Sequence, residues 1–204
     1  MSLDDLLDGY RAFRSGTWPA ARDRYRGLAK AGQHPATLVI GCSDSRVAPQ
    51  VIFNAGPGEL FEIRNVAGLV PPYGPDLRYH GTSAALEYGV RVLKVRQIVV
   101  LGHGQCGGIQ AMVEGAPDEA KDFVEPWMSI ARPVLKPAPP DLEGTDLLRF
   151  YEAKVVRLSL TNLMSFPWIA ERVEAGTLKL HGFHFAIATG VLARLEGDRL
   201  VPVE

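Results

Sequence analysis

Two short apolar segments with a helix between them constrain the fold of this chain more than any other feature. Residues 37–41 (Thr-Leu-Val-Ile-Gly) and 97–101 (Gln-Ile-Val-Val-Leu) are continuous, β-branched runs of the kind that form buried parallel strands. Residues 82–94 between them have the apolar spacing of an amphipathic helix, and no hairpin signal joins the two runs. A strand, a helix and a second strand predict a right-handed parallel crossover.

The whole pattern predicts an α/β protein with a mostly parallel central sheet flanked by helices. Further strands are predicted at 59–64 and 178–188 with a closing hairpin over 191–203, and further helices at 109–114, 118–136 and 146–166. Residues 1–204 are predicted to form a single domain, in which 1–30 form an N-terminal helical arm interrupted at Thr17-Trp18-Pro19. The amphipathic arm must dock either on its own domain or on a second subunit.

Length and composition exclude several classes of protein. The chain has 204 residues, a net charge of −1 and no basic stripe, so we expect no nucleic-acid partner. No stretch approaches the roughly 20 apolar residues of a membrane helix. The N-terminal segment has no apolar run typical of a signal peptide, and two cysteines do not make a disulfide framework. We therefore expect a cytoplasmic protein that does not interact with a membrane.

The predicted strands at 37–41 and 97–101 lead directly into residues that bind soft metal ions. Cys42 follows the first run, and His103 and Cys106 follow the run at 97–101. Because the carboxyl ends of neighbouring parallel strands meet at one edge of a sheet, we expect the three side chains to converge. Two thiolates and an imidazole suit zinc, and three protein ligands with one open position are typical of a catalytic zinc.

Other interpretations of the two cysteines explain less of the pattern. Inert buried thiols are common, but they leave the glycines at 102, 104, 107 and 108 unexplained. A redox pair is disfavoured because the cysteines are far apart in the sequence and form no Cys-x-x-Cys motif. A Cys–His nucleophile pair leaves the second cysteine without a role.

Asp44 and Arg46 are the candidate catalytic residues. Zinc lowers the pKa of a bound water towards about 7, and the resulting hydroxide attacks a small electrophile. If Asp44 binds the zinc, water is excluded and the site is closed. If Arg46 holds Asp44 in a bidentate pair, the fourth position opens and the carboxylate orients the hydroxide. The simpler alternative is an ordinary salt bridge within a loop.

The segments Cys-Ser-Asp-Ser-Arg at 42–46 and His-Gly-Gln-Cys-Gly-Gly at 103–108 resemble the paired signatures of the β-class carbonic anhydrases. The similarity covers roughly residues 33–195. It includes 57–61, 64–67, 71–73, 81–88, Gly182 and 189–190.

This resemblance implies an activity, a cofactor and an assembly. The activity is the reversible hydration of CO2 to bicarbonate. The cofactor is one zinc ion per subunit, held by Cys42, His103 and Cys106. The assembly is a homodimer or a multiple of dimers, with the N-terminal arm over the partner subunit.

The resemblance also implies roles for five residues around the substrate. Gln33 matches a hydrogen-bond donor to substrate, and the backbone amide of Gly107 matches a second donor. Phe61, Val66 and Tyr88 match an apolar pocket wall, part of which the family takes from the neighbouring subunit.

Two positions depart from a subgroup of the family. In that subgroup a bicarbonate bound beside a tryptophan, an arginine and a tyrosine stabilises the closed state. Arg64 matches the arginine, but Val39 and Phe185 replace the tryptophan and the tyrosine, so the indole donor and the phenol hydroxyl are missing. We expect the open, plant-like pattern at neutral pH, with Asp44 paired to Arg46.

Two alternative functions stay open at this level. A hydrolase of CS2 or COS has the same ligands and a different access route. A zinc or bicarbonate sensor that keeps the fold has no need of Asp44, Arg46 or Gln33.

Overall fold

The computed structural model describes residues 1–76, 78–135 and 140–204, which divide into two compact units, 1–34 and 35–204. The first unit consists of α1 (Leu3–Ala12), the π-helical turn η1 (Phe13–Thr17) and α2 (Trp18–Ala31). Ser2 begins α1 in a capping box with Asp5, in which each side chain accepts from the backbone N–H of the other residue. None of the residues in these helices is buried.

The interruption predicted within the arm is a π-helical turn rather than a break. Pro19 lies in the first turn of α2 and has no N–H to donate to the preceding helical turn. The helix therefore widens locally over η1 and continues.

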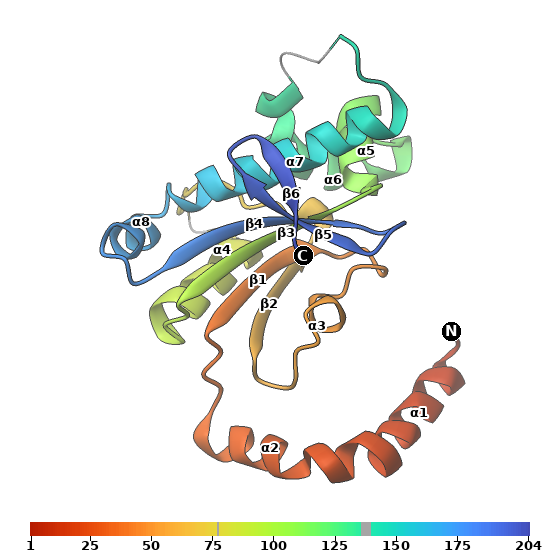
Figure 1. The fold of residues 1–204 in the computed structure, drawn as a ribbon, viewed down its shortest axis with the longest axis vertical. Coiled ribbons are helices and arrows are strands. Elements are labelled where there is room, and N and C mark those ends of the chain that lie inside the picture. The colour runs from red at the N-terminus through yellow and green to blue at the C-terminus, as the bar shows by residue number, and fades with distance from the viewer. Residues whose placement is uncertain (77, 136–139) are drawn as a thin grey trace. The chain divides into compact units, whose positions relative to one another are not determined.

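The second unit is built on one six-stranded sheet of order β2-β1-β3-β4-β5-β6, shown in Figure 1. Its strands are β1 (Thr37–Cys42), β2 (Leu60–Asn65), β3 (Gln97–His103), β4 (Lys179–Ala186), β5 (Val191–Glu196) and β6 (Arg199–Pro202). The first four strands pair in parallel, and β5 and β6 add two antiparallel pairings. The predicted α/β class and the mostly parallel sheet are confirmed.

The central strand β1 is buried on both faces of the sheet, which explains its continuous apolar sequence. On one face, Leu38 and Ile40 join a core with residues of α4, α7 and α8. On the other face, Val39 packs with Val99 and Leu101.

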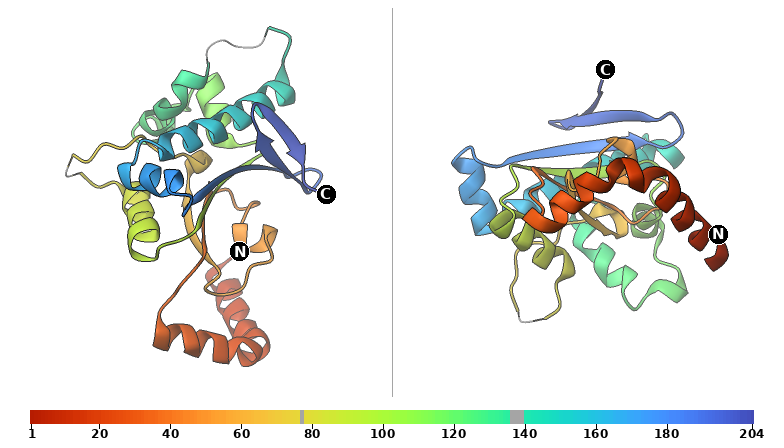
Figure 2. Two further views of the ribbon diagram at one scale, coloured as in Figure 1. Left: turned by 60° about the vertical axis from the view of Figure 1, so that its left-hand side comes forward. Right: turned by 90° about the horizontal axis from the view of Figure 1, so that it is seen from below.

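The second unit also contains α-helices, several of which pack against the sheet. They are α3 (Pro49–Ile52), α4 (Gly81–Glu87), α5 (Gly107–Glu114), α6 (Val124–Met128), α7 (Gly144–Leu163) and α8 (Pro167–Glu174). Shorter turns are η2 (Val66–Gly68), η3 (Tyr88–Val92), η4 (Asp118–Ala120) and η5 (Ser129–Leu135). Helix α7 packs along β3 and β4 with α5 beside it (Figures 1 and 2).

Two glycines let α7 approach the sheet closely. A Cβ atom on Gly102 would lie 2.6 Å from Val156 Cγ2, and one on Gly182 would lie 2.9 Å from Val156 Cγ1. Side chains at these positions would force α7 away from the ends of β3 and β4. The glycines therefore determine how close α7 comes to the residues that follow β3.

Several predicted elements differ in detail. The helix predicted over 82–94 begins at Gly81, with no side-chain cap from 82 or 83, and ends in η3. The helix predicted over 118–136 is divided into η4, α6 and η5, because Pro126 and Pro133 cannot donate backbone hydrogen bonds. Helix α8 was not predicted, and Pro167 occupies its first turn. The predicted break at 137–140 lies mostly outside the described residues.

None of the helices in the described ranges is long and apolar enough to cross a membrane.

Candidate metal centre

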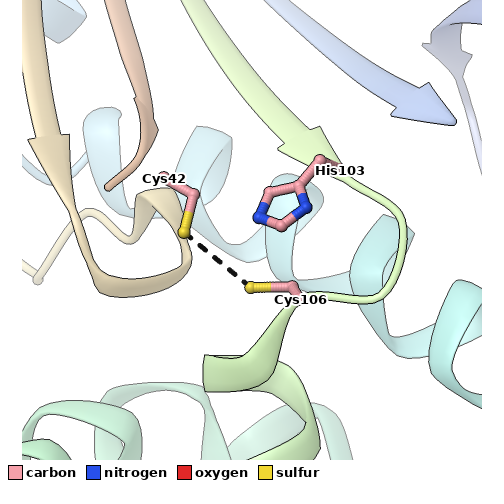
Figure 3. Close-up of side chains that lie close together, drawn as sticks. All are labelled: Cys42, His103 and Cys106. Carbon is pink, nitrogen blue, oxygen red and sulfur yellow. Dashed lines mark hydrogen bonds between the residues drawn. The ribbon is translucent and has the colours of Figure 1, made fainter. Parts of the chain in front are cut away.

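Three side chains from separate segments converge at the carboxyl edge of the sheet. Cys42 is the last residue of β1, His103 is the last residue of β3, and Cys106 is the residue that precedes α5. Their ligand atoms all lie within 4.8 Å of one another, and Figure 3 shows the two sulfurs and the imidazole turned towards one another. All three residues are buried. The predicted convergence of the metal ligands is confirmed.

The distance between the two sulfurs fits a shared metal ion. Sγ of Cys42 lies 4.0 Å from Sγ of Cys106, and both cysteines are free. Two thiolates on a tetrahedral zinc, each at about 2.3 Å, lie roughly 3.8 Å apart, whereas a disulfide requires about 2.05 Å. The separation therefore matches zinc ligation.

The imidazole of His103 is oriented for the same ion. Its Nδ1 lies 2.9 Å from the carbonyl oxygen of Gly104 and donates to it, which leaves Nε2 with a free lone pair. Nε2 is buried and has no hydrogen-bond partner among the described residues. An orphaned buried nitrogen is costly, and a bound zinc would satisfy it.

A hydrogen bond between the two thiols shifts their pKa values in opposite directions. The hydrogen bond from Cys106 lowers the pKa of Cys42 well below its usual range, and backbone N–H groups of Asp44 and Ala67 add to this effect. The same hydrogen bond to Cys42, together with burial, raises the pKa of Cys106. Cysteine binds a metal ion as the thiolate, so binding of a dication here would release the protons of the thiols.

The carboxylate of Asp44 is paired with the guanidinium of Arg46. Nε of Arg46 lies 2.9 Å from Oδ1 and Nη2 lies 2.7 Å from Oδ2, while the backbone N–H of Arg46 also donates to Oδ1 at 2.9 Å. The hydrogen bonds from Arg46 hold the pKa of Asp44 well below its usual range. The same pairing raises the pKa of Arg46. The bidentate pair considered in the sequence is present, and both groups are charged.

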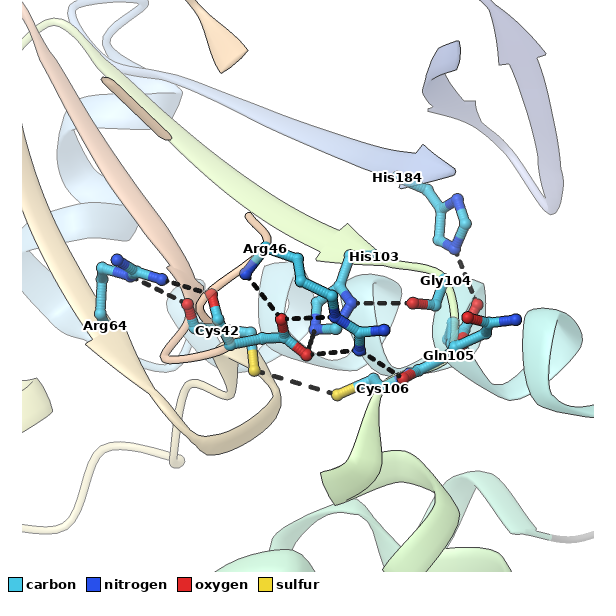
Figure 4. A network of polar contacts seen from close by, with 10 residues as sticks. Cys42, Arg46, Arg64, His103, Gly104, Gln105, Cys106 and His184 are labelled. Carbon is cyan, nitrogen blue, oxygen red and sulfur yellow. Dashed lines mark hydrogen bonds and ion pairs between the residues drawn. The ribbon is translucent and has the colours of Figure 1, made fainter. Parts of the chain in front are cut away.

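Arg64 holds the loop that carries Cys42 and Asp44. Its Nε donates to the carbonyl oxygen of Cys42 at 3.0 Å, and its Nη2 donates to the carbonyl oxygen of Asp44 at 2.7 Å (Figure 4). The sequence indicated Arg64 only as a match to a bicarbonate-binding arginine. Its guanidinium instead donates to the backbone of the loop that follows β1.

Two of the predicted substrate residues lie beside the metal centre. Val66 begins η2, and its Cγ1 would lie 2.7 Å from a Cβ on Gly108, so it packs against the start of α5. Gly107 is the first residue of α5, directly after Cys106. Nothing lies within 4 Å of the position where a Cβ on Gly107 would stand, so there is open space beside its Cα.

Of the other three predicted substrate residues, Phe61 and Tyr88 are not brought to the metal centre of the same chain. Phe61 pairs with Leu38, four residues before Cys42 on β1, which places it roughly 13 Å along the strand from the metal ligands. The ring of Tyr88 packs against Phe61 with centroids 6.0 Å apart. Gln33 belongs to the first unit, after the end of α2. The roles of these three residues stay predictions.

A buried pair of side chains beside the turn was not anticipated. Glu152 on α7 and His184 on β4 are 3% and 2% exposed, and Nε2 of His184 lies 2.8 Å from Oε2 of Glu152. The signal in the sequence was a carboxylate on the apolar stripe of a helix, between the buried residues Tyr151 and Val155.

The fold and the site define an α/β protein with a Cys-His-Cys cluster that can bind a metal ion. A family model described as carbonic anhydrase matches residues 37–192. The chain therefore belongs to the carbonic anhydrase family, and its relatives place it in the β class.

Curated relatives match over most of the chain. Beta carbonic anhydrase 5, chloroplastic, from Arabidopsis thaliana is 37% identical over 90% of this chain and 61% of its own length. Beta carbonic anhydrase 3 from the same plant is 34% identical over 97% of this chain and 78% of its own length. A carbonic anhydrase from Synechocystis sp. is 35% identical over 96% of this chain and 72% of its own length. The chain thus spans less than two thirds of the first of these relatives.

Solved structures of β-carbonic anhydrases also resemble this chain. The β-carbonic anhydrase CcaA superposes with a TM-score of 0.90 at 33% identity, over 99% of this chain and 92% of that one. A β-carbonic anhydrase from Sordaria macrospora, described as tetrameric, superposes with a TM-score of 0.82 at 28% identity, over 94% and 95%. The Coccomyxa β-carbonic anhydrase, solved with acetazolamide, has a TM-score of 0.79 at 30% identity, over 95% and 86%.

Proposed function

We propose that this protein catalyses the reversible hydration of CO2 to bicarbonate and a proton, with one zinc ion per subunit. The observation that carries the proposal is the position of Asp44. Three side chains supply the ligands of a tetrahedral ion, and the carboxylate that could supply the fourth is held by Arg46 instead. A purely structural zinc site has no need of such an arrangement, because it is closed by a fourth protein ligand.

The residues of the chain divide the work between them. Bound zinc lowers the pKa of a water towards about 7 and so supplies a nucleophile at neutral pH. Cys42, His103 and Cys106 would hold the ion. Asp44, ionised by its pairing with Arg46, accepts a hydrogen bond from the attacking water and thereby orients the lone pair that attacks CO2.

The start of α5 is the proposed binding surface for the substrate oxygens. The first N–H groups of a helix have no partner within the helix, and the amide of Gly107 is the first of these after the ligand Cys106. Val66 lies beside it and supplies an apolar wall. A developing bicarbonate would be stabilised by such an amide.

The assembly belongs to the same proposal. We propose a homodimer, or a multiple of dimers, in which Gln33, Phe61 and Tyr88 complete the substrate pocket of a neighbouring subunit. The distance of Phe61 from the metal ligands of its own chain supports this assembly. The exposed apolar residues of α1 support an arm that packs on a partner, and the description of one related structure as tetrameric is in keeping with it.

The open-site, plant-like subtype and a cytoplasmic location complete the proposal. The buried valine at 39 and the engagement of Arg64 with backbone carbonyls support the subtype. The location is supported by the need to keep both ligand thiols reduced.

Stopped-flow measurement of CO2 hydration by the zinc-loaded protein tests the proposed function. We expect turnover of CO2 that depends on zinc and is lost in Asp44→Asn. A parallel assay with CS2 and COS identifies a hydrolase if those substrates react and CO2 does not. Zinc bound without turnover of any of the three would instead indicate a sensor and would overturn the proposal.

A further inference from the structure

Glu152 contacts the metal-binding turn directly. Its Oε1 accepts the backbone N–H of Cys106 at 3.3 Å, and its Oε2 accepts from Nε2 of His184 at 2.8 Å. Both side chains are buried, and a buried carboxylate requires such partners. The assigned chemistry of the metal centre uses neither residue.

The contact with Cys106 connects Glu152 to the catalytic pair through one peptide group. The N–H of Cys106 and the carbonyl of Gln105 belong to the same peptide, so a single planar unit is held at both ends. Glu152 holds the N–H end, and Nη2 of Arg46 donates to the carbonyl end at 3.2 Å, as Figure 4 shows for Arg46 and Gln105. The same Nη2 binds Asp44 at 2.7 Å.

The turn needs this support because its backbone is strained and its packing is open. Gln105 has a φ of 57°, a left-handed conformation that costs a non-glycine residue about 1 kcal/mol or more. A cavity of about 170 Å³ lies beside the turn and is lined in part by Gly104, Gln105, Glu152 and His184. Hydrogen bonds, rather than close packing on that side, therefore fix the orientation of the peptide.

A second contact attaches the turn to β4 next to His184. The backbone N–H of Gly104 donates to the carbonyl oxygen of Phe185 at 2.9 Å. The turn is thus held by β4 at Gly104 and by Glu152 at Cys106, and Glu152 is itself held by His184 on β4.

We propose that Glu152, oriented by His184, is a positioning residue that sets the Gln105–Cys106 peptide, and thereby both the metal ligand Cys106 and the guanidinium that holds Asp44. This inference rests on the proposed function for its activity readout and deepens it. Removing the hydrogen bond to Cys106 would let the peptide rotate, so that Arg46 loses one acceptor and Cys106 loses its fixed approach to the metal.

Two conservative variants separate the hydrogen bond from the charge. Glu152→Gln removes the charge but keeps an oxygen that can accept the N–H of Cys106, while its amide can donate to the other tautomer of His184. Glu152→Asp keeps the charge, but its side chain is shorter by one methylene group, so the carboxylate no longer reaches the N–H of Cys106. Ser159→Ala is the matched control. Ser159 lies on the same helix, is buried, and accepts a hydrogen bond through its Oγ from the N–H of Val70 at 3.2 Å. The substitution removes that hydrogen bond without changing a contact of the turn.

The experiment measures kcat/KM for CO2 and the rate at which zinc passes to a chromogenic chelator, each on zinc-loaded protein. We expect Glu152→Asp to lower kcat/KM by about tenfold or more and to speed zinc release by a similar factor, as is typical when a partner of a metal ligand is lost. Glu152→Gln should stay within about threefold of the wild type in both. Ser159→Ala should lose stability with both values unchanged.

Two results would overturn the inference. One is a Glu152→Asp variant that matches the wild type in both measurements. The other is a Glu152→Gln variant as impaired as Glu152→Asp, because Glu152→Gln keeps the acceptor for the N–H of Cys106 and that hydrogen bond would then not account for the effect. Should Glu152→Asp not fold, His184→Leu takes its place with the same expected direction, because it releases the second carboxylate oxygen. If the wild type does not hydrate CO2, the proposed function fails, whereas the order of zinc-release rates still tests the positioning.

Discussion

Oδ2 of Asp44 lies 4.0 Å from Nε2 of His103, the nitrogen that is free to bind a metal. At this distance the carboxylate borders the metal centre without being one of the three converging ligands. A rotation of the side chain would bring the carboxylate closer to the three ligands, and its hydrogen bonds to Arg46 oppose that movement. The hydrogen bonds to Arg46 therefore hold Asp44 outside the group of three ligands.

Arg46→Ala should close the site. Without the guanidinium, Asp44 is free to bind the ion, and we expect kcat/KM for CO2 to fall on the order of 100-fold while one zinc per subunit is retained. Stopped-flow kinetics and zinc X-ray absorption measure the two effects. Arg132→Ala is the control, since Arg132 makes a surface pair with Glu125 at 3.4 Å. Unchanged kinetics in Arg46→Ala would contradict the role given to the pair.

Cys42→Ser should lose the metal. A serine hydroxyl is not deprotonated under conditions that make cysteine a thiolate, so we expect zinc content and CO2 turnover to fall at least about tenfold. Elemental analysis of the purified protein measures the zinc. Wild-type protein stripped with a chelator should recover both properties when zinc is added back, and the variant should not.

Alanine substitutions at the two neighbouring glycines at the start of α5 should have different effects on stability. A Cβ on Gly108 would meet Val66 Cγ1 at 2.7 Å and Ala67 Cβ at 3.2 Å, so Gly108→Ala should destabilise the protein by about 1–3 kcal/mol. Gly107→Ala meets nothing within 4 Å and should leave stability unchanged or slightly raised. Urea unfolding measures both. A loss of CO2 turnover in Gly107→Ala at full stability would support its predicted place beside the substrate.

The acid stability of the loop should depend on Asp44. Arg46 holds the pKa of Asp44 below the usual value of about 3.9. A carboxyl group with a lowered folded-state pKa contributes stability that is present above its unfolded pKa and is lost as the pH falls through its folded pKa. The difference in free energy of unfolding between wild type and Asp44→Asn should therefore stay constant from pH 7 to about 4 and shrink only below that. Urea unfolding of chelator-treated proteins measures it, and a difference that already disappears near pH 5 would contradict the pairing.

Bicarbonate should not switch this protein. Arg64 donates to the carbonyl oxygens of Cys42 and Asp44, and the side chains of Val39 and Phe185 carry no hydrogen-bond donor. We expect simple, non-cooperative inhibition by bicarbonate and no change in zinc coordination when it is added. Sigmoidal inhibition, or a fourth protein ligand appearing with bicarbonate, would show that the departure at these positions has no such effect.

The sequence predicted the elements whose signals are local. The apolar run that became β1 and the run that became β3 were clear because both strands are buried on both faces, so their composition needed no partner to be recognised. The candidate metal ligands could be predicted from the same strands, since the residue type and its position at the end of a strand can both be identified in the sequence. Helix boundaries were predicted less well: the helix predicted over 146–166 ends at Leu163, and Pro167 begins a separate helix, α8.

Sequence by itself determined which residues can bind zinc and that parallel strands would bring them to one edge, because residue chemistry and strand periodicity are properties of short segments. Only the tertiary structure decided how the turn after β3 is held. The glycines at 102 and 182 let α7 lie against the sheet, and that approach places Glu152 on the N–H of Cys106 although the two are 46 residues apart. Such a contact depends on the packing distance between a helix and a sheet, which no short segment of the sequence encodes.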